Sequence, residues 1–269
     1  MTDRPRRTGK GRDSRALLGV AAIVVVFLGL PVATLVVRAL VDGSLLGLAG
    51  SGEVLGALGL SLATTAASLI LTVVIGLPLA FVLARRSFRG KWLAEAVVDL
   101  PIVLPPAVAG LALLLVLGRR GLFGGALENA GVEIAFTTVA VVIAQTFVSA
   151  PFFIRSARAG IASVDRDLED AARVDGASEA RLFRDITLAL AAPAIAAGLV
   201  MSWARALGEF GATIMFAGNI AGRTQTLPLL VYTEFQGSLD AAVAAACVLV
   251  LAAIGVLVAV RLTHWRAVL

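Results

Sequence analysis

Six long apolar runs constrain this chain more than any other feature of its sequence. They cover residues 16–37, 54–84, 100–117, 134–154, 186–204 and 241–260. Each has about 18 residues or more, which is enough to cross a bilayer as a helix. Helices pair their backbone polar groups internally, as lipid requires, and the runs lack the polar–apolar alternation of membrane-barrel strands. The pattern predicts an all-α membrane protein with about six transmembrane helices.

The composition excludes an ordinary soluble domain. The mean hydropathy is +0.96, and 59% of the residues are hydrophobic, well above the share in soluble proteins. The net charge of +5 does not indicate nucleic-acid binding, because the basic residues lie mainly beside the apolar runs. The single cysteine, Cys247, lies inside an apolar run and can form no intrachain disulfide.

Arginine and lysine residues cluster at one set of run ends. They precede the first run and follow the second, fourth and sixth, whereas the opposite ends carry few. The positive-inside rule therefore places both termini in the cytoplasm, together with the segment between the fourth and fifth runs. On this interpretation, residues 1–15 form a basic cytoplasmic tail and residues 16–269 form the membrane domain.

The cytoplasmic segment between the fourth and fifth runs is highly charged but keeps a helical period. Apolar residues recur at spacings of three to four residues on both sides of Gly176. Ser178 follows as a candidate N-cap, with Glu179 in the first turn of the second helix. The pattern predicts a helix–glycine–helix elbow over residues 165–189.

The elbow resembles the EAA loop of type I ABC-importer permeases. That pattern is Glu-Ala-Ala, three residues, Gly, nine residues and Ile-x-Leu-Pro; here Asp170 replaces the Glu and Ala189 replaces the Pro. The resemblance implies that the elbow docks on a separate cytoplasmic ATPase. The ATPase-coupling residues implied are Glu169, Asp170, Ala171, Ala172, Gly176, Ile186 and Leu188.

The stretch after the fifth run is too apolar for a free loop and too interrupted for a clean span. Arg205 and Glu209 are one helical turn apart and can pair, and ionisable groups near membrane depth usually face a bundle interior or water. The stretch is similar to molybdate permeases, and sulfate/thiosulfate and tungstate permeases carry variants of it. The pore or gate residues implied are Arg205, Gly208, Glu209, Gly211, Gly218 and Asn219.

The resemblance implies a homodimer in a prokaryotic inner membrane that imports an oxyanion, and it predicts molybdate as that oxyanion. An ABC ATPase dimer and an extracytoplasmic binding protein would be its partners. ATP and Mg would bind the ATPase, because this chain has no phosphate-binding loop, no cofactor motif, no metal-ligand cluster and no catalytic constellation. An ion-coupled secondary transporter and a membrane-embedded enzyme remain as alternatives.

Overall fold

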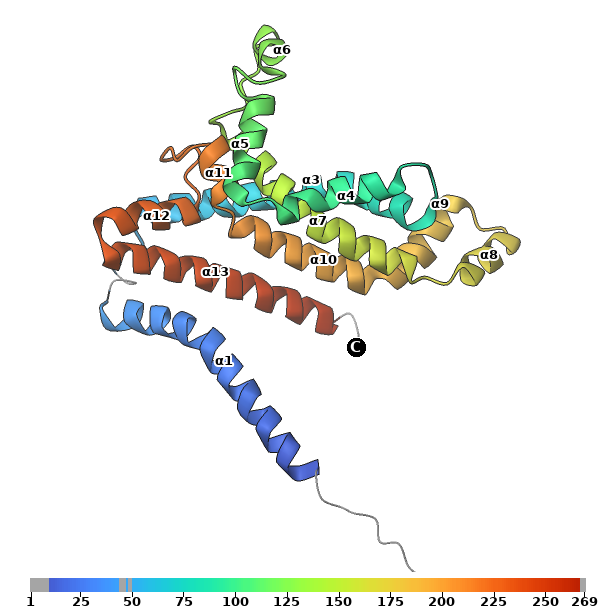
Figure 1. The fold of residues 1–269 in the computed structure, drawn as a ribbon, viewed down its shortest axis with the longest axis horizontal. Coiled ribbons are helices and arrows are strands. Elements are labelled where there is room, and N and C mark those ends of the chain that lie inside the picture. The colour runs from blue at the N-terminus through green and yellow to red at the C-terminus, as the bar shows by residue number, and fades with distance from the viewer. Residues whose placement is uncertain (1–9, 44–46, 48–49, 267–269) are drawn as a thin grey trace, which may run out of the picture.

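A computed structural model describes residues 10–43, 47 and 50–266, and all its regular elements are helices. Figure 1 shows α3, α4, α7, α10 and α13 side by side along the long axis, with α5 and α6 projecting from them. The helices are α1 (Lys10–Val41), α3 (Gly52–Arg85), α4 (Lys91–Val103), α5 (Pro106–Leu117), α6 (Gly124–Asn129), α7 (Thr138–Ala162), α8 (Arg166–Val174), α9 (Glu179–Leu182), the π-helix η1 (Phe183–Leu188), α10 (Ala189–Leu207), α11 (Gly211–Phe216), α12 (Leu227–Gly237) and α13 (Leu239–Arg266).

The membrane-spanning helices agree with the prediction in number. Within the described residues, five helices are long and apolar enough to cross a membrane, and a bent pair brings the number to six. The five are Leu17–Val41, Gly52–Arg85, Thr138–Ala162, Glu179–Leu207 and Leu239–Val258. The all-α membrane architecture is therefore confirmed.

The third predicted span, residues 100–117, is wrong as a single straight helix. The chain turns by 118° between α4 and α5. Pro105 and Pro106 explain the turn, because proline lacks an amide donor and disfavours helical backbone in the residue before it. Pro106 instead occupies the first position of α5. At 12 residues, α5 is about 18 Å long and is too short to cross a bilayer.

Asp99 lies inside α4, which begins eight residues earlier at Lys91. Its carboxylate lies 3.6 Å from Arg155, and Glu95, one turn earlier, lies 2.8 Å from Arg158. These two ion pairs tie α4 to α7 in antiparallel register.

The N-terminal helix extends further toward the terminus than the sequence predicts. Residues 10–15, assigned to the basic tail, continue α1, whereas residues 1–9 lie outside the described part of the chain. No residue in the most apolar window of the span Leu17–Val41 is buried against the rest of the chain. Arg38 near its end pairs with Asp42 and with Asp240 of α13.

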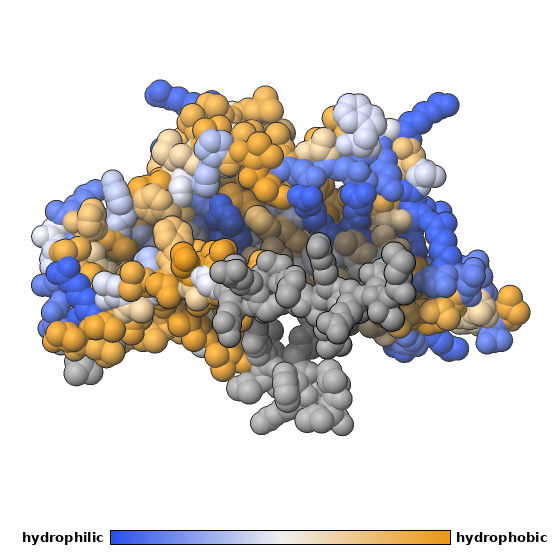
Figure 2. All heavy atoms as spheres, turned by 60° about the horizontal axis from the view of Figure 1, so that its bottom comes forward, coloured by the Kyte–Doolittle hydropathy of each residue, from blue (hydrophilic) through white to orange (hydrophobic). Residues whose placement is uncertain are grey.

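Helices α3, α7 and α10 form the centre of the bundle through small residues. A Cβ atom added at Gly198 of α10 would lie 2.8 Å from Cβ of Ser156 on α7, and one at Gly160 would lie 2.5 Å from Cβ of Ala194. Such close approach is typical of membrane helices, which gain no hydrophobic free energy by leaving lipid. Figure 2 shows broad apolar areas on the visible face, with hydrophilic residues gathered toward the end of the molecule that carries α8 and α9.

Candidate functional site

The predicted elbow exists, and its turn depends on Gly176. Asp165 caps α8 by accepting the amide of Asp167 at 3.0 Å. At the other end, the amide of Ala177 donates to the carbonyl of Ala172 and that of Gly176 donates to Arg173, which is the Schellman arrangement. Gly176 has φ +84° with open space around its Cβ position. The turn therefore requires left-handed backbone, which glycine adopts without a steric penalty.

Glu169 fastens α8 to the membrane helices from inside. Its Oε1 atom lies 2.6 Å from Nη2 of Arg85, at the end of α3, and accepts a hydrogen bond from Thr187 of η1 at 2.8 Å. Arg85 also donates to the carbonyl of Val164. The side chains of Arg85 and Glu169 are only 9% and 7% exposed. The contacts that the structure gives Glu169 therefore lie within the chain and hold α8 on α3 and η1.

Arg173 links the two helices of the elbow at the surface. It donates to Asp170 at 2.6 Å and to Glu179 at 2.7 Å. The hydrogen bond with Glu179, followed by the one with Asp170, raises the pKa of Arg173 above its ordinary value. Asp170, which stands at the Glu position of the EAA pattern, remains 69% exposed and accessible to a partner.

The face of α8 that points away from the chain carries apolar side chains. Leu168 is 51% exposed and Val174 is 87% exposed, and Ala171 lies between them on the surface. The apolar period of the sequence does not reveal this surface, because Leu168 follows Ile161 and Val164 at a helical spacing. Those two residues are buried, but α7 ends at Ala162 and α8 begins a new helix at Arg166. The capping signal of Asp165 could have identified the break.

The second half of the elbow is helical but not uniformly α-helical. Ser178 accepts the amide of Arg181 at 3.4 Å, so the predicted N-cap is confirmed. The chain then forms the π-helix η1 before α10 continues. Ile186 and Leu188 are half-buried in η1, whereas Thr187 between them is fully buried against Glu169. The apolar period predicted only an ordinary helix here, and π segments are often found at functional sites.

Arg205 and Glu209, the predicted pair, are in contact where α10 ends. Nη1 of Arg205 lies 2.5 Å from Oε2 of Glu209, and Glu209 is only 1% exposed. Its other oxygen, Oε1, accepts the amide of Ala212 at 2.6 Å. The carboxylate therefore holds the start of α11 against the end of α10. A negative charge is favourable at the start of α11, because a helix N-terminus presents unpaired amide donors.

The three glycines among the predicted gate residues, Gly208, Gly211 and Gly218, have different surroundings. A Cβ atom at Gly211 would lie 2.8 Å from Cβ of Pro106, so α11 packs directly on the start of α5. Gly218 has φ +73° and lies against the ring of Phe136. Gly208 has φ −86° and ordinary space, so its position does not require glycine. Asn219 donates to Thr233 of α12 at 2.8 Å.

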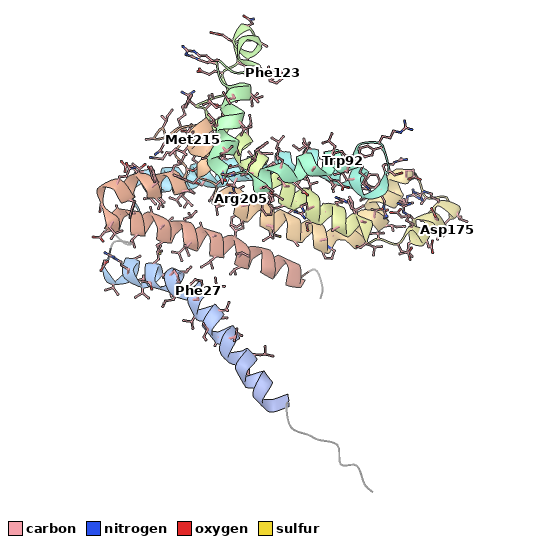
Figure 3. The ribbon with its side chains drawn as sticks, in the orientation of Figure 1. Phe27, Trp92, Phe123, Asp175, Arg205 and Met215 are labelled. Atoms are coloured by element: carbon pink, nitrogen blue, oxygen red, sulfur yellow. The ribbon has the colours of Figure 1, made fainter. Side chains whose placement is uncertain are left out.

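The elbow and the predicted gate residue Arg205 lie at opposite ends of one helical segment. In Figure 3, Asp175 marks the tip of the elbow and Arg205 lies near the far end of α10. The segment Glu179–Leu207 has 29 residues, or about 43 Å at the rise of an α-helix. One continuous helical segment therefore connects the elbow with the chain just before α11. Among the described residues, no group of three or more His, Cys, Asp or Glu side chains could hold a metal ion.

Comparison with known sequences identifies a family. The family model described as "binding-protein-dependent transport system inner membrane component" matches residues 76–264. The molybdenum transport system permease protein ModB of Mycobacterium tuberculosis is 44% identical over 197 residues, covering 73% of this chain and 75% of the relative. The sulfate transport system permease protein CysT of Salmonella typhimurium is 36% identical over 163 residues, covering 61% and 59%.

Solved structures support the same fold. A chain of a bacterial ABC transporter that imports the polysaccharide alginate superposes with a TM-score of 0.75 at 19% identity, over 94% of both chains. A chain of the MetNI methionine ABC transporter gives a TM-score of 0.59 at 18% identity. These identities bear on the fold alone. The family match and the relative that is 44% identical establish that the chain belongs to the binding-protein-dependent inner membrane components and is the non-catalytic, multi-pass permease of an ABC importer.

Proposed function

We propose that this permease imports molybdate. The observation that carries the proposal is the 44% identity over 73% of the chain with a molybdenum transport permease, against 36% over 61% with a sulfate permease. Sulfate, thiosulfate and tungstate are the competing substrates, because all are tetrahedral oxyanions. An extracytoplasmic binding protein delivers the anion, in keeping with the family's binding-protein dependence.

Coupling to ATP hydrolysis takes place through the elbow. A cytoplasmic ATPase, which binds ATP and Mg, contacts the exposed face of α8 around Leu168, Ala171 and Val174. Burying these apolar side chains supplies binding free energy, and the exposed carboxylate of Asp170 adds a charged contact. The predicted coupling residues Ala172, Gly176, Ile186 and Leu188 shape the elbow around this face. Movement of the ATPase then displaces α8 and the long helical segment joined to it.

The pore is formed by two copies of the chain. Helix α5 projects from the bundle (Figure 1), and apolar side chains such as Leu111 and Leu115 are 43% and 64% exposed on it. Its base packs against α11 through Gly110 and Gly211. A second copy contacting α5 would place the gate residues Arg205, Glu209 and Gly211 beside the dimer axis, with Gly208, Gly218 and Asn219 around them. The dimer accounts for the projection of α5.

Both termini and the elbow lie in the cytoplasm, as the distribution of arginine predicts. Substituted cysteines test this orientation, since the only native thiol, Cys247, is fully buried. Arg184→Cys in the elbow, where the side chain is 77% exposed and lies outside the proposed ATPase contact, should react with a membrane-impermeant maleimide only after the cells are permeabilised. Gln236→Cys, exposed at the opposite end near the α12–α13 turn, should react in intact cells. The reverse result would contradict the proposed orientation.

Radiolabelled molybdate uptake tests the substrate. Cells that lack this chain should lose high-affinity uptake, and the restored chain should give uptake that excess tungstate inhibits and excess sulfate does not. Unchanged molybdate uptake together with lost sulfate uptake would move the chain to the sulfate branch. Uptake that collapses with a protonophore at constant ATP would contradict ATP coupling and favour ion coupling.

A further inference from the structure

A pocket of about 760 Å³ opens between the last turns of α3 and the elbow. One side of the pocket is apolar, and the rings of Phe81 and Phe183 meet there edge to face at 5.0 Å between centroids. Leu77, Pro78 and Leu182 extend this wall. The other side is charged and carries four arginines and three carboxylates: Arg85, Arg86, Arg166, Arg173, Glu169, Asp170 and Glu179. The pocket is therefore amphipathic.

Two of the four arginines are not used by the elbow itself. Arg85 pairs with Glu169, and Arg173 pairs with Asp170 and Glu179. Arg86 and Arg166 are exposed and make no ion pair with any described residue. They come from different elements, the end of α3 and the start of α8, and line the same pocket. Arg86 is near enough to Glu179 to help Arg173 lower the pKa of that carboxyl group. The lining still has four arginines against three carboxylates, an excess of one positive charge. This excess and the exposure of Arg86 and Arg166 favour an anionic group at the pocket rim.

An exposed apolar track on α3 leads into the pocket. Ile70 and Val74 are 66% and 63% exposed, and Pro78 follows at the same four-residue spacing, so the three share one helix face. Pro78 lines the pocket about 12 Å along the helix axis from Arg86. The track and the rim together match a molecule with an apolar chain and an anionic head.

We propose that this pocket binds an anionic phospholipid of the cytoplasmic leaflet. The phosphate contacts Arg86 and Arg166, and an acyl chain lies along Pro78, Val74 and Ile70. Basic pockets beside membrane helices on the cytoplasmic side are suited to such headgroups. The bound lipid bridges α3 and α8 and supports the elbow at the height of the membrane surface. The inference rests on the orientation proposed above.

The pocket and the apolar centre of the proposed ATPase contact lie on different faces of α8, and Asp170 and Val174 lie at the boundary between the two faces. Arg166, Glu169, Asp170 and Arg173 line the pocket, and their spacing of i, i+3, i+4 and i+7 defines one helix face. Leu168 and Ala171 point about 160° and about 140° away from Arg166 at 100° per residue. Lipid and ATPase can therefore bind at the same time, and the ATPase does not need to fill the pocket.

Lipid retention by the purified full-length chain tests the proposal. The protein in mild detergent is incubated with phosphatidylglycerol and phosphatidylcholine of identical acyl chains, and retained lipids are counted by native mass spectrometry. Arg86→Gln/Arg166→Gln is the pocket variant. Arg89→Gln/Arg181→Gln is the control, because it removes the same charge at exposed positions that do not line the pocket. The wild type and the control should prefer phosphatidylglycerol. The pocket variant should lose that preference by tenfold or more, since each of the two arginines contributes about fivefold.

Three results would overturn the assignment. One is equal retention of the two lipids by the wild type, and another is equal loss of preference in the pocket variant and the control. The third is displacement of phosphatidylglycerol by millimolar inorganic phosphate, which would assign the arginines to a free oxyanion. Retention is measured without transport, so each of these results would leave the molybdate proposal unaffected.

Discussion

The buried ion pair between Arg85 and Glu169 should decide how firmly the elbow is held, and Glu169→Gln tests this. The substitution keeps the shape of the side chain but leaves the Arg85 guanidinium, 9% exposed, without its carboxylate at 2.6 Å. Removing one partner of a buried pair costs about 3–5 kcal/mol. The residual exposure and the hydrogen bond from Arg85 to Val164 favour the lower end, about 3 kcal/mol.

The cost should appear as local opening of α8 and not as global unfolding, because the pair connects the elbow to α3. Hydrogen exchange of the full-length protein in nanodiscs measures this free energy of local opening. A loss of about 3 kcal/mol corresponds to an increase of about 100-fold in the opening equilibrium. Amides of residues 169–174 should therefore exchange about 100 times faster in Glu169→Gln, whereas amides in the middle of α7 should be unchanged.

Asp170→Asn is the matched control. Asp170 lies next in sequence and has the same 2.6 Å contact with an arginine, Arg173, but its side chain is 69% exposed. Solvent screens an exposed pair, so exchange in α8 should stay close to the wild-type rate. The double variant Arg85→Met/Glu169→Leu should recover much of the lost protection, because an apolar pair leaves no buried charge. Equal exchange in Glu169→Gln and Asp170→Asn would refute the reasoning.

Two further predictions concern the turn and the gate. Gly176→Val should lower the stability of the turn by about 1–2 kcal/mol or more, because valine is strained at a φ of +84°. Uptake should fall while membrane insertion stays unchanged, and Gly176→Asn should take up substrate almost as the wild type does. Normal uptake by Gly176→Val would show that the turn is not needed for coupling. Glu209→Ala should lower the thermal stability strongly, because it leaves Arg205 unpaired and the amide of Ala212 uncapped. Glu209→Gln should lose less, since its amide oxygen can still accept from Ala212, and equal losses in the two variants would contradict the capping role.

Much of the architecture could be predicted because the information is local in the chain. The apolar runs, the helix–glycine–helix elbow and the cap at Ser178 each depend on residues within a few positions of one another. The failures are also informative. The run 100–117 is apolar throughout, so hydropathy alone could not detect the 118° turn, although Pro105 and Pro106 marked its position. The exposed Leu168 was missed because one apolar period continues across the break between two helices.

The sequence by itself determined that the chain crosses a membrane and which segment forms the elbow. It also determined that Gly176 stands at the turn of the elbow. These properties depend on hydropathy and on backbone sterics, which act within a segment. Only the tertiary structure decided that Glu169 pairs with Arg85, 84 positions away, and that Gly211 lies against Pro106. Helices in lipid gain no hydrophobic free energy from association, so their contacts depend on close packing and on buried polar pairs. Which faces fit together is a property of all the helices at once, and no single stretch of sequence contains it.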